Sequence, residues 1–173
     1  MIPTEEPDFE AFVLAHGPEL LAFARRLTLD HHRAEDLVQE VLARIGLSWS
    51  RTGRIADLRA YAYKAVLNDF LSWRRRRSST ERATADPDRR DHSTAALPED
   101  TVVLRGELQE LLGVLPVVQR AVLVLRYYLD RSDAEIAVML GCRQSTVRSH
   151  ARRARAALDA ARGTRTPSER TRR

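Results

Sequence analysis

The fold is decided by residues 132–160, SDAEIAVMLGCRQSTVRSHARRARAALDA. Ser132, followed three positions later by Glu135, forms a capping-box pattern that predicts the start of a helix of one to two turns. Gly141 is placed to end this helix, and a new helix is expected to begin around Ser145. Two helices joined by a short turn that contains glycine are typical of a helix-turn-helix.

The second of these helices has an apolar side and a cationic side. The apolar positions recur at helical spacing and are predicted to pack inward against the first helix. They are Val147, Ala151, Ala154 and Leu158, facing Ile136, Ala137 and Leu140. The outer positions, which can donate to base edges or phosphates, are Gln144, Thr146, Arg148, Ser149, Arg152, Arg153 and Arg155. The first four are expected to read bases and the last three to hold phosphates. A merely solvated helix is the alternative, because arginine is the cation everywhere except at Lys64.

Helical periodicity extends over the rest of the chain, in which seven glycines and seven prolines leave long stretches without a helix breaker. Apolar spacing predicts three further helices that form one small bundle. They cover residues 8–27, 31–47 and 57–77. Asp57 is a suitable N-cap for the third, and a loop around residues 48–54 precedes it. Gly17-Pro18 leaves a bend or a break open in the first helix.

The chain is predicted to consist of two small helical domains joined by a flexible linker. Residues 78–100 have no apolar period, two prolines and mixed charge, so they cannot bury a core. Helices are expected over residues 101–115 and 116–129, followed by two short ones. We therefore expect an all-α fold. Its parts are domains at residues 8–77 and 101–160, the linker at residues 78–100 and a basic disordered tail at residues 161–173.

Charge is distributed unevenly along the chain. Residues 1–50 hold nine acidic residues and four arginines, whereas residues 131–173 hold four acidic residues and eleven arginines. A basic end indicates nucleic acid as a partner, and an acidic front indicates a protein. Cys142 is the only cysteine, which excludes an intrachain disulfide and a cysteine zinc site and fits the cytoplasm. No signal peptide or long apolar run predicts export or membrane insertion.

The acidic front is concentrated in the second predicted helix, beside its apolar stripe. Its acidic and amide side chains form i,i+4 pairs, which are Glu35 with Gln39 and Asp36 with Glu40. An edge that is both acidic and apolar is suited to docking a protein. The alternative is an ordinary charged surface, on which Glu40 and Arg44 would form a pair worth about 0.3–0.5 kcal/mol.

The third predicted helix ends in Trp73 followed by four arginines, Arg74–Arg77. Basic charge beside aromatic rings suits single-stranded DNA, because backbone attraction then adds to base stacking. Compensation of the helix dipole explains one or two arginines at a helix end but not four. Trp73 also sits at core spacing, so burial of its ring is the alternative to stacking on a base.

Five motifs occur in a fixed order along the chain. They are AEDLVQEVLARI (34–45), a tryptophan-containing loop, LRAYAYKAVLNDFLSWRRRR (58–77), LQELLGVLPVVQRAVLVLRYY (108–128) and STVRSHARRARAAL (145–158). This order strongly resembles the extracytoplasmic-function (ECF) group of sigma-70-family RNA polymerase sigma factors over about residues 8–160. The LSWRRRR ending resembles the SigE-like subset in particular.

The resemblance implies an alternative sigma factor that is not an enzyme and needs no cofactor or metal. Residues 8–77 would be region 2 and residues 101–160 region 4. The implied partners are core RNA polymerase, through its beta-prime clamp helices and beta flap, and promoter DNA. An anti-sigma factor is common in the resembling group, but no residue of the sequence identifies one.

The resemblance also implies roles for individual residues. The residues implied to dock on polymerase are Asp36, Leu37, Gln39 and Glu40. The residues implied to recognise and melt the minus-ten element are Trp49, Arg54, Asn68, Trp73, Arg74, Arg75, Arg76 and Arg77. Region 4 would place its last helix in the major groove of the minus-35 element. Arg143 and His150 depart from the usual pattern of the group, so a promoter sequence cannot be carried over.

Two other functions compete with the sigma factor hypothesis. A stand-alone helix-turn-helix regulator would use residues 8–77 for dimerisation or effector binding and would bind a palindromic site without polymerase. An enzyme acting on nucleic acid is disfavoured, because no paired carboxylates in a cleft context, metal-ligand spacing or glycine-rich phosphate loop occurs. His31 and His32 are interpreted as a surface pair.

Overall fold

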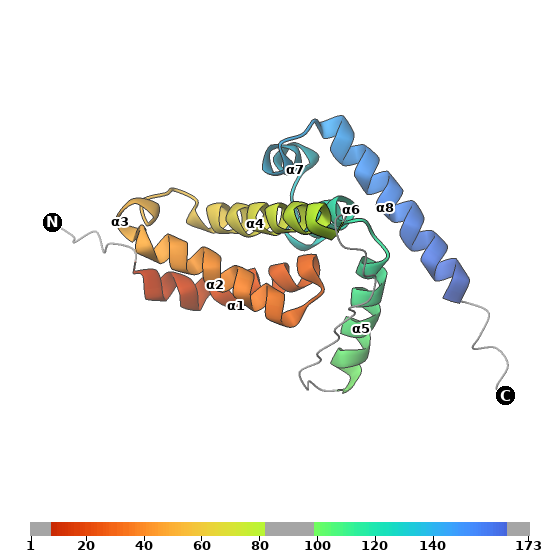
Figure 1. Ribbon diagram of the computed structural model, residues 1–173, viewed down its shortest axis with the longest axis horizontal. Coiled ribbons are helices and arrows are strands. Elements are labelled where there is room, and N and C mark those ends of the chain that lie inside the picture. The colour runs from red at the N-terminus through yellow and green to blue at the C-terminus, as the bar shows by residue number, and fades with distance from the viewer. Residues whose placement is uncertain (1–7, 82–98, 166–173) are drawn as a thin grey trace. The chain divides into compact units, whose positions relative to one another are not determined.

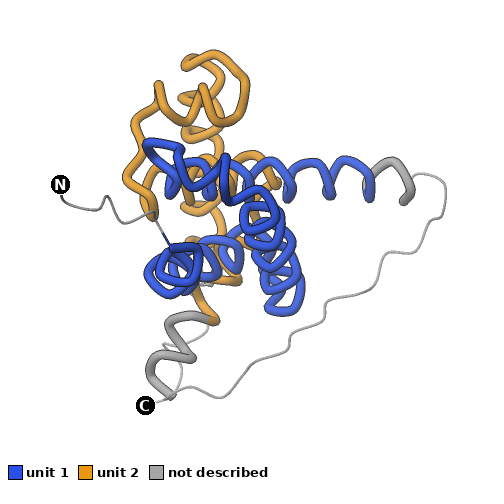
Figure 2. Tube along the Cα trace, turned by 90° about the vertical axis from the view of Figure 1, so that its left-hand side faces the viewer, with its two compact units in different colours: residues 1–94 blue, residues 95–173 orange. Residues whose placement is uncertain are grey.

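A computed structural model of the chain describes residues 8–81 and 99–165 (Figure 1). Within these two ranges every regular element is helical, which confirms the predicted all-α fold. The chain forms two compact units, residues 1–94 and residues 95–173, distinguished by colour in Figure 2. Each unit has its own buried core.

The first unit is a three-helix bundle with one additional helical turn. Its long helices are α1 (Phe9–Thr28), α2 (His31–Leu47) and α4 (Leu58–Glu81), and the short α3 (Trp49–Thr52) precedes α4. Each long helix packs against the other two (Figure 1). The fully buried apolar residues of this unit include Leu20, Phe23, Leu27, Leu37, Val41, Val66 and Leu67. The ring of Phe23 in α1 meets the ring of Tyr63 in α4 edge to face at 5.2 Å, so an aromatic pair joins two of the helices.

Short polar side chains set the ends of these helices. Asp8 accepts a hydrogen bond from the Glu10 backbone N–H at 3.1 Å and starts α1. Asp30 accepts from the Arg33 N–H at 2.9 Å and starts α2. Asp57 accepts from the Ala60 N–H at 2.8 Å, which confirms the cap expected for α4.

The structure of the first unit answers one question that the sequence left open and differs from the prediction in one place. α1 continues through Pro18 without a break, because the turns after the proline bury their apolar side chains in the core. Residues 48–54, expected as a loop, contain α3. Thr52 stabilises this turn, since its buried hydroxyl donates to the Ile45 carbonyl at 2.9 Å.

The predicted flexible linker is shorter than expected at both ends. α4 continues to Glu81 and the first helix of the second unit begins at Glu99, so residues 78–81 and 99–100 are helical. Neither end carries a proline or glycine that would break a helix. The remaining linker residues, 82–98, lie outside the described residues.

The described residues of the second unit, 99–165, form four helices and one turn of π-helix. They are α5 (Glu99–Gly113), α6 (Val117–Leu123), the π turn η1 (Val124–Tyr128), α7 (Asp133–Leu140) and α8 (Gln144–Arg165). α8 packs against both α6 and α7. The buried apolar residues of this unit include Leu115, Ala121, Val122, Leu125, Ile136, Val147 and Ala154. The α7–α8 pair is the predicted helix-turn-helix.

Two helices of the second unit differ from the prediction. The helix expected over residues 116–129 widens into η1, which inserts one extra residue into a turn and has no signature in apolar periodicity. α8 is 22 residues long rather than short. Residues 161–165, expected in the disordered tail, are therefore helical, because the alanines that precede them favour helix. Residues 166–173 lie outside the described residues.

Candidate nucleic-acid interface

The turn between α7 and α8 is held by the predicted capping box and glycine. The Ser132 hydroxyl accepts from the Glu135 N–H at 3.3 Å, and the Ser132 N–H donates to Glu135 Oε2 at 2.8 Å. The backbone bond from Ser132, its hydroxyl and the Arg131 guanidinium together lower the pKa of Glu135 to about 2. Gly141 ends α7 at a φ of 64°, in the left-handed region that favours glycine. Both sequence signals are confirmed.

One side of α8 is buried in the second unit, so only the opposite side is available to a partner. Val147 and Ala154 are fully buried and Ala151 nearly so, as their spacing predicted. Leu158, expected to be buried with them, is only half-buried. The inward face therefore covers the first three turns of α8, and the residues opposite it point to solvent.

The predicted DNA-binding residues of α8 lie on this outer side. Six of the seven are exposed, namely Gln144, Thr146, Arg148, Arg152, Arg153 and Arg155. Ser149 is half-buried, and its hydroxyl accepts a hydrogen bond from Arg153 at 2.9 Å. The structure also brings Arg148 within 3.4 Å of the Gln144 side-chain oxygen. The side chains at the start of α8 thus form contacts with one another one turn apart.

Two residues outside α8 contact this arginine row, and a third forms an ion pair with one of them; none of the three was predicted from the sequence. Arg155 donates to the Tyr127 hydroxyl at 2.6 Å, and Tyr127 itself is 62% exposed. Asp133, the first residue of α7, forms an ion pair with Arg126 of η1 through Oδ1, and its Oδ2 lies 3.5 Å from Arg148 Nε. These partners come from separate elements, so no local sequence pattern relates them.

His150 lies at one of the two positions where the sequence departs from the resembling group. Burial, and secondly the charge of Arg153, lower the pKa of this imidazole. His150 is therefore neutral near pH 7. The outer charge of α8 consequently comes from its arginines and not from His150.

A second cationic cluster surrounds Trp73 near the end of α4. The guanidinium carbons of Arg33, Arg74 and Arg77 lie 4.7, 5.6 and 5.7 Å from the centre of the Trp73 ring. Each distance is within the range of a cation–π interaction. Arg33 comes from α2 and was not predicted. We call Arg33, Trp73, Arg74 and Arg77 the Trp73 cluster. Its tryptophan is half-buried, and the arginines of α4 from Arg74 to Arg77 are exposed.

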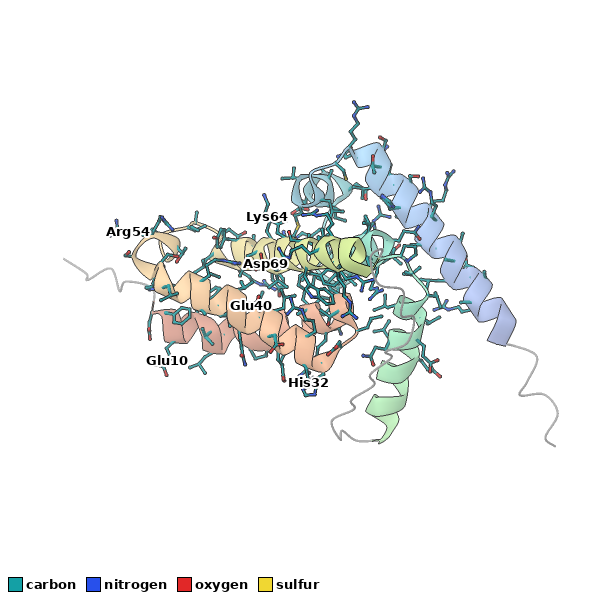
Figure 3. All side chains as sticks on the ribbon, viewed as in Figure 1. Glu10, His32, Glu40, Arg54, Lys64 and Asp69 are labelled. Atoms are coloured by element: carbon teal, nitrogen blue, oxygen red, sulfur yellow. The ribbon has the colours of Figure 1, made fainter. Side chains whose placement is uncertain are left out.

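The other residues expected at the minus-ten element have different surroundings. Trp49 packs on α1, with its ring 5.2 Å from that of Phe9 and 6.1 Å from that of Phe12, so it helps to hold α3 in place. Arg54, in the segment after α3 (Figure 3), and Asn68 of α4 are exposed.

The exposed side of α4 includes two further residues that sequence reasoning missed. Tyr61 is 39% exposed, and Lys64, labelled in Figure 3, is exposed. Together with Asn68 they follow an i, i+3, i+7 spacing, which places them on one side of the helix. That spacing was the available signal for a polar stripe along α4.

The acidic side of α2 is exposed, with one exception. Asp36, Gln39 and Glu40 reach solvent (Figure 3 labels Glu40), but Leu37 is fully buried in the bundle core. Leu37 is thus the member of the predicted docking set that its burial keeps from direct contact with a partner. We call Asp36, Gln39 and Glu40 the acidic α2 face.

The ion pairs around the acidic α2 face differ from those of the ordinary-surface alternative. Arg44, which that alternative paired with Glu40, binds Asp69 of α4 at 2.7 Å. Glu40 lies 3.9 Å from Arg33. Arg44 thus helps to join α2 to α4, and Glu40 keeps a side chain that is 60% exposed.

Within residues 8–81 and 99–165, no three side chains of histidine, cysteine, aspartate or glutamate gather as a metal site would require. Over the same residues no helix has the length and apolar character needed to cross a bilayer. His31 contacts Glu35 at 2.9 Å.

Comparison with known protein families gives a match to each of the two units. Residues 12–80 match the family model for sigma-70 region 2, and residues 105–158 match the model for sigma-70 region 4. The chain belongs to the sigma-70 family. The stand-alone regulator considered from the sequence is contradicted, because region 2 occupies the part of the chain that this alternative required for dimerisation or effector binding. Members of the sigma-70 family are transcription initiation factors and not catalysts themselves.

Individual sigma factors resemble this chain over most of its length. The RNA polymerase sigma-E factors of Streptomyces avermitilis and Streptomyces coelicolor are 36% and 35% identical to it. Each alignment covers 87% of this chain, and they cover 83% and 84% of the respective relatives. Among solved structures, the sigma factor RpoE of Bartonella quintana, in complex with the anti-sigma factor NepR, superposes with a TM-score of 0.74 at 26% identity. That match covers 90% of this chain and 97% of the other.

Proposed function

We propose that this chain is an alternative sigma factor of the ECF group that directs core RNA polymerase to a dedicated set of promoters. The observation that carries the proposal is the occurrence of region 2 and region 4 in this order within one chain. In this role the protein works in the cytoplasm, lowers the barrier to initiation by binding, and forms no covalent intermediate. The polymerase carries out the chemistry.

The acidic α2 face is the proposed docking site for the beta-prime clamp helices. Asp36, Gln39 and Glu40 present oxygens and one amide to solvent along one side of α2. Carboxylates there attract a basic partner and orient its approach. The beta flap is the proposed partner of the second unit.

The Trp73 cluster, together with the exposed residues Tyr61, Lys64 and Asn68 along α4, is the proposed minus-ten surface. Arginines along α4 supply a sequence-independent attraction to the backbone. Arg54 and Asn68 are exposed and can contact unpaired bases. Trp49, which packs on α1, serves this site by positioning α3. Extruding a base costs a few kcal/mol, and contacts to the exposed single strand offset this cost at about 1–3 kcal/mol per stacked base.

The outer side of α8 is the proposed minus-35 surface. The N-terminal end of a recognition helix contacts base edges in the major groove, which assigns base reading to Gln144, Thr146, Arg148 and Ser149. Arg152, Arg153 and Arg155 follow one to three turns later and are assigned to phosphates. Two modest DNA sites on one polymerase act at high effective concentration, so neither needs to bind tightly alone.

An anti-sigma factor is a further proposed partner. The support is the Bartonella quintana relative, which shares the fold over 90% of this chain and was solved with its inhibitor bound. An inhibitor of this kind would keep the chain away from polymerase in the resting cell.

The proposal predicts that the chain binds promoter DNA stably only when core polymerase is present. The measurement is a gel shift of a labelled promoter fragment with the chain alone, core polymerase alone and both together. Only the mixture is expected to retain the fragment at physiological salt, because each DNA-binding unit is weak by itself. Tight binding of the fragment by the chain alone, unaffected by polymerase, would contradict it.

A further inference from the structure

Asp133 is placed between two arginines of different elements. Its Oδ1 accepts from Arg126 of η1, and its Oδ2 lies 3.5 Å from Nε of Arg148 in α8. Both Asp133 and Arg126 are about three-quarters covered, with side-chain exposures of 26% and 25%, whereas Arg148 is 68% exposed. The Asp133 carboxylate is thus anchored by the largely covered Arg126, and its second oxygen lies toward the exposed Arg148.

This contact restrains one edge of an exposed arginine that also contacts Gln144 of its own helix. A long, exposed arginine side chain has many rotamers and loses that freedom when it binds. Asp133 holds Arg148 at Nε, and the Gln144 oxygen lies 3.4 Å from Nη2. Neither contact uses Nη1. Reading a guanine requires the planar guanidinium to face O6 and N7 of the base. A guanidinium that is held at Nε keeps a fixed plane, and its Nη1 side is left to face the base.

The contact is not needed to start α7. The capping box of Ser132 and Glu135 already satisfies the N–H groups of Glu135 and of Ser132 at the start of that helix. A carboxylate close to DNA also repels phosphates, and here two arginines offset its charge. Asp133 is therefore placed to orient Arg148, and the two arginines offset the repulsion between its carboxylate and DNA.

We propose that Asp133 is a positioning residue that holds the guanidinium of Arg148 in the orientation that reads one base pair of the minus-35 element. This inference deepens the proposed function and rests on it, because it requires that Arg148 contacts a base. Asp133 then contributes to promoter specificity without touching DNA.

The test measures sequence preference and not total affinity. The full chain is combined with core polymerase, and bound fragments are selected from a promoter library randomised across the minus-35 element. Arg148→Ala identifies the base pair that Arg148 reads, because the preference there, expected to be about tenfold or more in the wild type, collapses. Asp133→Asn is expected to reduce the preference at that same base pair to about threefold or less. In the Arg148→Ala background, Asp133→Asn should change it no further.

Asp130→Asn is the matched control. Asp130 is exposed, takes no part in the contact with Arg148, and has a φ of 50° that asparagine tolerates. This variant removes the same charge three residues away, so it should raise binding to all sequences alike and leave the preference unchanged. Thermal unfolding of the two variants checks that both remain folded.

Three results would overturn the inference, and they are distinguishable. If Arg148→Ala collapses the preference but Asp133→Asn leaves it intact, Arg148 reads the base without help from Asp133. If Arg148→Ala leaves every preference intact, the proposed role of Arg148 fails and the inference fails with it. A loss of preference at all base pairs alike in Asp133→Asn would also overturn the inference, because it indicates general disorder of the helix-turn-helix.

Discussion

Replacing Glu40 by arginine is expected to weaken binding of the chain to core RNA polymerase by about thirty-fold or more. Glu40 is 60% exposed on α2, and its nearest cation, Arg33, is 3.9 Å away, so its carboxylate is available to a basic partner. Loss of one member of a charge pair inside an interface costs about 2–5 kcal/mol, and each 1.4 kcal/mol is a factor of ten. Fluorescence anisotropy of the labelled chain, titrated with core polymerase, measures the change.

Asp36→Arg serves as a second variant on the same face, and Glu10→Arg is the control. Glu10 is exposed on α1 (Figure 3), so the control applies the same charge reversal outside the acidic α2 face. Circular dichroism should show unchanged helix content in all three variants. Equal weakening by Glu10→Arg and Glu40→Arg would mean that only net charge matters and that α2 is not the docking site.

The second large effect is expected when Val147 is replaced by aspartate. Val147 is fully buried on the inner side of α8, the helix that packs against α6 and α7. An unpaired carboxylate there either unfolds the unit or takes up a proton at a cost of several kcal/mol. We expect the free energy of unfolding of the second unit to fall by about 3 kcal/mol or more. Urea denaturation followed by circular dichroism measures this loss.

The exposed side of α8 offers a matched control for this variant. Ala156→Asp places the same carboxylate on the same helix in solvent, where the cost should stay within about 1 kcal/mol. Val147→Asp should retain polymerase binding through the first unit while losing dependence on the minus-35 element. Unfolding of Val147→Asp and Ala156→Asp at the same urea concentration would mean that Val147 is not buried by the packing of α8 in the second unit.

The features that the sequence predicted correctly are those that depend on near neighbours. Ser132 and Glu135 are three residues apart, and Gly141 ends the helix that they start. The helix-turn-helix could therefore be predicted without knowledge of tertiary contacts. The inward side of α8 followed from the spacing of Val147, Ala151 and Ala154. Asp57 was identified as a cap for the same reason, because its acceptor group serves an N–H only three residues away.

The features that were missed depend on contacts between distant segments. Arg44 binds Asp69 rather than the neighbouring Glu40, and this choice requires α2 and α4 to be placed first. Arg33 reaches Trp73 from another helix, so the Trp73 cluster was predicted only in part. Leu37 was assigned to the docking surface because the resemblance implied one role for the whole motif that contains it. Burial differs from residue to residue within that motif, and Leu37 is fully buried.

Run-off transcription with core polymerase tests the central claim most directly. Purified core polymerase is given genomic fragments of the host of this protein, with and without the chain, and new transcripts are mapped. New start sites should appear only when the chain is added, and they should be lost when Arg148 and Arg152 are both changed to alanine. If the chain yields no new start site with an active core polymerase, the assignment of this protein as a promoter-directing sigma factor is contradicted.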